Sequence, residues 1–312
     1  MKLLRIQRRF RRWLLPAILC GTALPQPIAP VTVAGGLRHT RLYTIATGRV
    51  LNHVQRDDAR ASLKASLDLI AQRKGFIVDS KVDIVDDLPA IRSRLREHSV
   101  DVLILGIAEF LDLESSHLVV PVLTDARGSQ ANGGHPYRLL ARPASGISSL
   151  ADLRGKNILV YSRSADNAGV AWLEVALARE KLGRAASFFA SLKLPEKPQA
   201  CILPLFFGTV DACVVDDFDL EMAREMNPQL GQLRTIASSP PLIDSVMAMP
   251  IQPHPFLREL LDTMLTLHED PRGRQMLMVF KSDRIVTLQP GDLDASRELW
   301  GAYSRLPAER KN

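Results

Sequence analysis

The feature that most constrains this chain is a repeated alternation between short apolar runs and longer stretches with apolar residues at helical spacing. In the first part, residues 42–47, 82–85 and 100–105 have the composition of strands, and residues 57–74 and 89–98 lie between them with helical periodicity. Strands that alternate with helices form βαβ units, whose sheets are largely parallel and whose crossovers are right-handed. The sequence therefore predicts an α/β fold with mostly parallel sheets flanked by helices.

The alternation stops once and then starts again. Residues 127–135 are rich in glycine and polar side chains, which predicts a break between two folding units. A second series of strands and helices follows from residue 137 to about residue 245, and the chain after residue 250 shows mainly helical patterns. Because 312 residues allow two domains of ordinary size, we expect two lobes.

The last, helical part has no sheet of its own, so we expect it to pack on the first unit. This assigns residues 35–136 and 250–312 to lobe one and residues 137–249 to lobe two. The chain then crosses between the lobes twice. These crossings are expected to form a two-strand hinge that lets the lobes close around a ligand.

The N-terminal segment, residues 1–34, has the layout of a secretory signal peptide. It carries six basic residues and no acidic residue, and its apolar stretch, residues 13–24, is too short to span a bilayer. A run of small residues at its end offers a cleavage site, so we expect export to the periplasm. A basic tail and an uncleaved anchor remain alternatives. Lipid anchoring at Cys20 is not expected, because the large Leu19 precedes it.

The positive charge of the chain is concentrated in that segment. The formal net charge is +6, and removal of the six basic residues leaves a mature chain near zero. Such a chain has no basic excess to hold the phosphate backbone of a nucleic acid, so we expect no nucleic-acid partner.

No pattern of catalytic or metal-binding residues stands out. The sequence lacks G-x-S-x-G, P-loop, G-x-G-x-x-G and H-E-x-x-H motifs, and its seven histidines are scattered. Cys201 and Cys213 have no neighbours at metal-ligand spacing; they either form one bridge or are buried as small apolar side chains. We therefore expect no metal, no cofactor and no enzymatic activity, although this fold class does host enzymes.

Four segments carry a resemblance to a known family. They are Val100–Gly106 (VDVLILG), Ser149–Lys156 (SLADLRGK), Gly208–Ala212 (GTVDA) and Leu233–Pro240 (LRTIASSP). In this order they resemble the type II periplasmic binding proteins, specifically the phosphonate/phosphate ABC-transporter binding family. The resemblance implies a periplasmic monomer that binds a small polar solute between its lobes and passes it to a membrane permease. A sensor or accessory domain of the same fold, which acts through a protein partner, is the alternative.

Ligands of open α/β sheets lie beyond the carboxyl ends of the strands. Such ends occur at residues 46–48, 106–110, 162–169 and 216–218, and a cleft between the lobes would bring them together. The candidate ligand-binding residues at these ends are Thr47, Glu109, Phe110, Ser164, Asp166, Asn167, Asp216 and Asp217. Phe110 could equally belong to the core, and the two adjacent aspartates could be solvated loop charges. Arg49 is a further candidate on the lobe-one side.

The loop at residues 162–169 (SRSADNAG) departs from the family pattern. In the phosphonate binders this place resembles S-T-S-G at a helix N-terminus, where hydroxyl groups, backbone N–H groups and the helix dipole hold an anion. Here the corresponding residues are Asp166–Gly169, so a carboxylate and an amide replace two hydroxyls. Asp166 is either a helix N-cap or a ligand contact. Because a carboxylate repels a phosphonate, an amine, a zwitterion or an uncharged polar solute becomes admissible.

Overall fold

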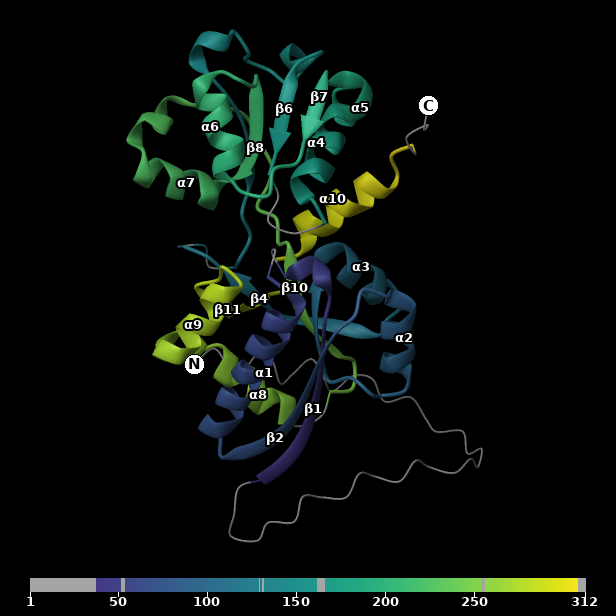
Figure 1. Ribbon diagram of the computed structural model, residues 1–312. Helices are drawn as coiled ribbons and strands as arrows, with labels where there is room; N and C mark the ends of the chain where they lie inside the picture. The colour runs from purple at the N-terminus through teal and green to yellow at the C-terminus, as the bar shows by residue number, and fades with distance from the viewer. Residues whose placement is uncertain are drawn as a thin grey trace.

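The computed structural model describes residues 38–51, 54–128, 130, 132–161, 166–253 and 256–307. These residues form two α/β lobes, which Figure 1 shows one above the other, each built around its own sheet. The expected signal peptide and Ser164 lie outside the described residues.

Lobe one contains a six-stranded sheet in the order β11-β4-β10-β3-β1-β2. Its strands are β1 (Arg38–Ala46), β2 (Phe76–Ile84), β3 (Val102–Gly106), β4 (Val119–Ala126), β10 (Ser245–Pro250) and β11 (Arg284–Thr287). Strand β1 pairs in parallel with β2 and β3, whereas β10 is antiparallel to both β3 and β4. The strand that returns from lobe two is thus inserted in the middle of the sheet.

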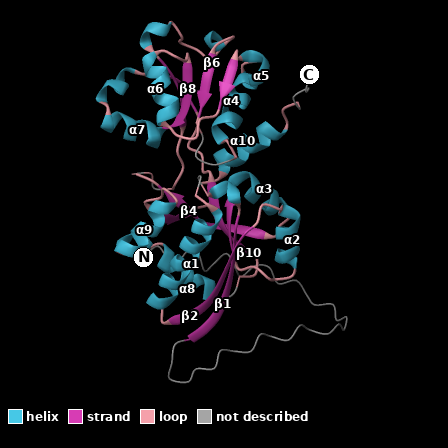
Figure 2. Cartoon of the chain, in the orientation of Figure 1, coloured by secondary structure: helices cyan, strands magenta, loops and turns pink. Residues whose placement is uncertain are grey.

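Both faces of this sheet are buried, because side chains alternate along each strand. Leu42 of β1 joins the core beneath α1 (Arg56–Arg73), α8 (Phe256–Met264) and α9 (Pro271–Val279). Ile45 of the same strand joins the core beneath α2 (Leu88–Arg96) and α3 (Ile107–Ser115). Figure 2 shows these helices on the two sides of the lobe-one strands.

Lobe two contains a five-stranded sheet in the order β7-β6-β8-β5-β9. Its strands are β5 (Tyr137–Ala141), β6 (Asn157–Val160), β7 (Ser191–Lys193), β8 (Ala212–Asp216) and β9 (Arg234–Ser238). Its helices are α4 (Ala168–Arg179), α5 (Ala185–Phe188), α6 (Gln199–Phe207) and α7 (Asp217–Met226). Strand β5, the first to enter the lobe, lies antiparallel between β8 and β9. Each sheet therefore combines a parallel set of three strands with a reversed crossing strand. In lobe one the edge strand β11 also runs antiparallel to its neighbour β4.

The structure moves two of the expected lobe boundaries. Residues 245–249 were assigned to lobe two, yet they form β10 of lobe one, because Val246 and Met247 bury against opposite faces of that sheet. The C-terminal helix α10 (Asp294–Ser304) was assigned to lobe one with the rest of residues 250–312. Its Leu299 instead completes the core of lobe two against α4, and the helix also contacts α3 of lobe one. The final helix therefore ties the lobes together.

The two crossings between the lobes lie side by side. Backbone N–H and C=O groups of His135 and Leu242 bond reciprocally, at 3.0 and 3.1 Å, so the crossings form a short antiparallel bridge. This is the two-strand hinge predicted from the sequence.

The two cysteines of the described chain are free and buried, Cys201 on α6 and Cys213 on β8. Cys201 Sγ donates to the carbonyl oxygen of Val214 at 3.4 Å. Burial, together with the neighbouring Cys201, raises the pKa of the Cys213 thiol well above its ordinary value. The sequence left open either one disulfide bridge or two buried small apolar side chains, and the structure shows the second.

Candidate functional site

The carboxyl ends of β1 and β3 in lobe one face the segment that enters α4 in lobe two. Thr47 follows β1, Glu109 lies in the first turn of α3 after β3, and Asp166 and Asn167 precede α4. Thr47, Glu109 and Asp166 meet in one polar cluster, as the rule for strand ends predicts.

On the lobe-one side, Glu109 is held in place by its own helix and by the neighbouring strand. Its Oε2 accepts from Thr47 Oγ1 at 2.5 Å and from the backbone N–H of Gly106 at 3.2 Å, so it reaches back over the start of α3 to the N-cap, as the N3 residue of a capping box does. Its Oε1 lies 3.3 Å from Nε of Arg49. Glu109 and Thr47 are both buried.

Asp166 crosses from lobe two to the N-terminus of α3. Its Oδ1 accepts from Arg49 Nη1 at 3.0 Å, and its Oδ2 accepts from the backbone N–H of Ala108 at 3.4 Å. The Asp166 side chain is 1% exposed and that of Arg49 is 49% exposed. A helix N-terminus with a guanidinium beside it is an anion-binding arrangement, and here a carboxylate of the chain itself occupies it.

The two carboxyl groups of this cluster are both harder to ionise than usual. Burial raises the pKa of Glu109, and the nearby Asp166 charge adds to the effect, while the bonds from Thr47 and Gly106 oppose it. Burial also raises the pKa of Asp166, against the opposing charge of Arg49. Two buried carboxyl groups thus share one half-exposed guanidinium, and the cluster is negative when both are ionised.

Asn167 adopts the left-handed conformation, with φ of 53°, at the N-cap of α4. Asparagine tolerates this region better than most residues, which gives its side chain a conformational role at the start of the helix. Its carbonyl oxygen accepts from the N–H groups of Val170 and Ala171, at 2.9 and 3.0 Å. Of the two interpretations left open for Asp166, the N-cap is wrong, because Asn167 holds that position.

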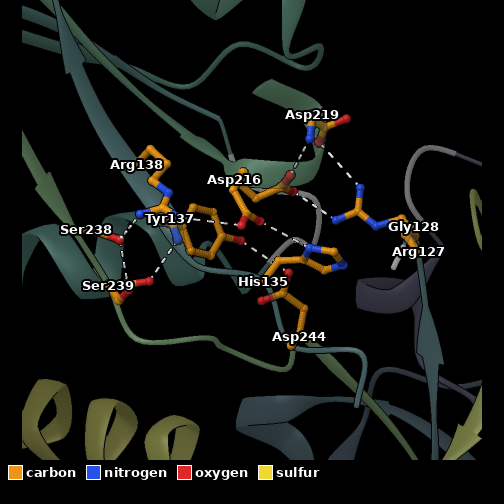
Figure 3. A network of polar contacts seen from close by, with 12 residues as sticks. Arg127, Gly128, His135, Tyr137, Arg138, Asp216, Asp219, Ser238, Ser239 and Asp244 are labelled. Atoms are coloured by element: carbon orange, nitrogen blue, oxygen red, sulfur yellow. Dashed lines mark hydrogen bonds and ion pairs between the residues drawn. The ribbon is translucent and has the colours of Figure 1, made fainter. Parts of the chain in front are cut away.

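Asp216 and Asp217 belong to a second polar network, at the hinge. Figure 3 shows Asp216 between Arg127 and Asp219 in this network. Asp216 caps α7 by accepting from the N–H of Asp219 at 2.8 Å, and its other oxygen accepts from Arg127 Nη2 at 2.9 Å. Burial acts to raise the pKa of Asp216, but the Arg127 charge and these hydrogen bonds outweigh it and lower the pKa.

Asp217, the next residue, faces the first crossing of the hinge. Its Oδ1 lies 3.2 Å from Nδ1 of His135, and its Oδ2 lies 3.7 Å from Nη2 of Arg138. These two carboxylates therefore bind groups of the chain itself, rather than being solvated loop charges.

Phe110 is fully buried in the core of lobe one, with Ile45, Leu105 and Leu113. The packing role left open by the sequence is the one the structure shows, because this residue points from the first turn of α3 into the sheet rather than towards lobe two.

Arg127 is a residue of the polar networks that sequence reasoning missed. It begins the glycine-rich segment after β4, so its neighbours in sequence suggest an exposed loop. Its side chain is only 5% exposed, because Asp216, which is 89 positions away, and the ring of Phe218 cover it. No local pattern signals such a partner.

Within the parts of the chain that the structure describes, no three His, Cys, Asp or Glu side chains gather in a way that could hold a metal ion. Over the same residues, every helix is too short or too polar to cross a membrane.

The chain has two lobes, a reversed crossing strand in each, a two-strand hinge, and strand ends that face each other. These features define the type II class of solute-binding proteins. The family model described as the periplasmic substrate-binding protein of the phosphonate ABC transporter matches residues 51–293. This chain belongs to that family and is a solute-binding protein. The family is a transport class and not an enzyme class, and it favours transport over the sensor or accessory role.

Solved structures share the fold at low sequence identity. The XAC2383 protein of Xanthomonas citri, bound to ATP, is 18% identical with a TM-score of 0.59; the match covers 85% of this chain and 97% of that one. PhnD1 of Prochlorococcus marinus, in complex with methylphosphonate, is 16% identical with a TM-score of 0.54, over 85% and 99%. A binding protein component of an ABC phosphonate transporter from Pseudomonas aeruginosa is 15% identical with a TM-score of 0.52, over 85% and 87%. No curated protein matches this chain in sequence.

Proposed function

We propose that this chain binds a small polar solute with a cationic or hydrogen-bond-donating group in the cleft between its lobes. We further propose that residues 1–34 direct its export, and that the permease of an ABC transporter receives the solute from the closed, monomeric protein. The observation that carries the choice of solute is the placement of Asp166, a buried carboxylate on the anion-binding end of α3.

Charge balance in the cleft argues against a simple phosphonate. A dianion would have to displace Asp166 from Arg49 and from the N–H of Ala108, and would then lie close to two carboxylates. A zwitterion avoids this cost, because its anionic end replaces Asp166 on lobe one while its cationic end meets the displaced carboxylate. A small amine meets the same carboxylates directly.

The proposed ligand contacts are the residues of the first cluster, Thr47, Glu109 and Asp166, with Asn167 and Ser164 of the same loop. Arg49 joins them, because its guanidinium is half-exposed beside both carboxylates. Asp216 and Asp217 are assigned to hinge stability instead, since other residues of the chain already bind both oxygens of Asp216 and Oδ1 of Asp217.

A thermal-shift screen tests this function. Phosphate, alkylphosphonates, aminoalkylphosphonates, amino acids and simple amines are added one at a time to the purified protein, and a true ligand raises the melting temperature by mass action. We expect responses from zwitterions or amines and little from phosphate. Asp166→Asn should reduce the response to cationic groups about tenfold in Kd, whereas Glu225→Gln on the exposed side of α7 should leave it unchanged. A response to phosphate that exceeds all the others would contradict the assignment.

Lobe closure is expected to depend on pH. Closure buries Glu109 and Asp166, which raises both pKa values, whereas in an open form these groups are hydrated and their pKa values fall back towards the ordinary carboxyl range. The closed form therefore binds more protons, so a fall in pH from neutrality towards about 4 should favour closure, and a rise should favour opening. Small-angle scattering of the unliganded protein across this range should show the radius of gyration increasing with pH; a constant radius in the wild type would contradict the linkage.

A further inference from the structure

Lobe one contains an apolar cavity of about 110 Å³ between its sheet and the helices α1, α8 and α9. Its walls are mostly aliphatic side chains and methionines, among them Leu67, Val102, Ile104, Met264 and Leu277. Thr47, Arg49, Glu109, Asp166 and Asn167, the proposed solute contacts that the structure describes, do not line it. It is therefore a space separate from the solute-binding site described above.

The cavity exists because small side chains occupy the middle of the sheet face. Thr44 and Ala46 of β1 pair with Val102 and Ile104 of β3, and they share the face that Leu42 presents to α1. Large residues at these two positions would fill the space under α1. Protein interiors are close-packed as a rule, so a void of this size is a specific feature of lobe one.

One polar atom in the cavity wall lacks a partner. Thr44 is 1% exposed, and its Oγ1 is buried without a hydrogen bond. The other lining hydroxyls are satisfied: Ser66 and Thr124 each donate to a backbone carbonyl oxygen at 2.8 Å, and Ser245 and Ser282 donate to Asp125 at 2.5 and 2.9 Å. A buried hydroxyl without a partner costs about 1–3 kcal/mol. A water molecule bound to the Thr44 hydroxyl would need two or more polar neighbours.

We propose that this cavity is a second binding site, for a small uncharged molecule that has an apolar ring or short chain and one hydrogen-bonding atom. At about 110 Å³ the cavity is somewhat smaller than an engineered apolar cavity of about 150 Å³ that stays dry and binds benzene or xenon, which limits the ligand to one small ring or a short chain. The Thr44 hydroxyl, which both donates and accepts, pairs with the single polar atom. The methionines adapt their shape to the ring.

The test uses benzene and phenol, two rings that differ by one hydroxyl group. Methyl groups of the methionines report binding by NMR: Met264 and Met276 line the cavity, and Met226, 79% exposed on α7, is the internal control. We expect saturable shifts of the Met264 and Met276 methyl signals with both probes, no shift of Met226, and a several-fold lower Kd for phenol.

Two variants separate the proposal from non-specific binding. Thr44→Val keeps the shape and removes the hydroxyl, so benzene should bind as before and phenol should lose its advantage; this variant should also unfold at higher temperature, because the buried hydroxyl without a partner is gone. Leu67→Trp should fill the cavity and abolish both responses. If that variant fails to fold, the comparison of benzene and phenol binding to Thr44→Val still tests the proposal.

The proposal is overturned if neither probe shifts Met264 or Met276 in the wild type. It is also overturned if phenol and benzene bind equally well, or if Thr44→Val leaves the preference for phenol intact. An ordered cluster of waters in the cavity of a crystal soaked in phenol would count against it as well.

Discussion

Gly106→Ala is expected to force the two lobes apart where they now touch. A Cβ at this position would lie closer to Oδ2 of Asp166 than side chains in real proteins approach, and 3.1 Å from its Cγ. The backbone itself accepts alanine, since φ is −63° and ψ is 152°. The added methyl therefore acts on the contact between lobes alone. Overpacking of about 1–3 kcal/mol should shift the equilibrium between open and closed forms roughly 5- to 150-fold towards the open form.

Small-angle scattering of the unliganded protein measures this effect as an increase in the radius of gyration. Gly231→Ala is the matched control, because a Cβ there meets no atom within 4 Å. The double variant Gly106→Ala/Asp166→Ala should be no more open than Asp166→Ala alone, since the group that the methyl strikes is already gone. An unchanged radius for Gly106→Ala would show that Asp166 moves aside at no cost and does not hold the lobes together.

Arg127→Met is expected to lower the free energy of unfolding by about 3–5 kcal/mol. Arg127 and Asp216 are both buried at the hinge and lie 2.9 Å apart, so removal of the guanidinium leaves an uncompensated buried carboxylate. Methionine keeps most of the volume, and the loss is therefore electrostatic. Urea denaturation monitored by circular dichroism gives the number.

A second substitution in the same variant separates charge from packing. Arg127→Met/Asp216→Asn should recover most of the loss, because asparagine removes the buried charge and still caps α7 through the N–H of Asp219. Glu221→Gln, which breaks an exposed pair with Arg224, should cost less than about 1 kcal/mol. A loss for Arg127→Met as small as that of the surface control would mean that water reaches Asp216, and the hinge would not depend on this ion pair.

The polar networks show which contacts of the candidate site local sequence patterns can predict. The sequence places Thr47, Glu109 and Asp166 at the ends of strands, and parallel strands bring their carboxyl ends to one edge, so the meeting of these residues could be predicted. The partner of Asp166 could not: Arg49 is 117 positions away, and only the approach of the two lobes makes the pair. The buried partner of Asp216 at the hinge, Arg127, could not be predicted either, because charge pairing has no periodicity that a sequence reveals.

Strand and helix periodicity in this chain determined the α/β class, the two lobes and the hinge, since alternation of apolar residues is set by the geometry of each element and needs no distant contact. Tertiary structure alone decided that β10 inserts between β3 and β4 and that α10 packs on α4. In both cases the segment carries apolar residues that either lobe could bury. Which lobe receives it depends on the shape left between other elements, and that information is distributed over the whole chain.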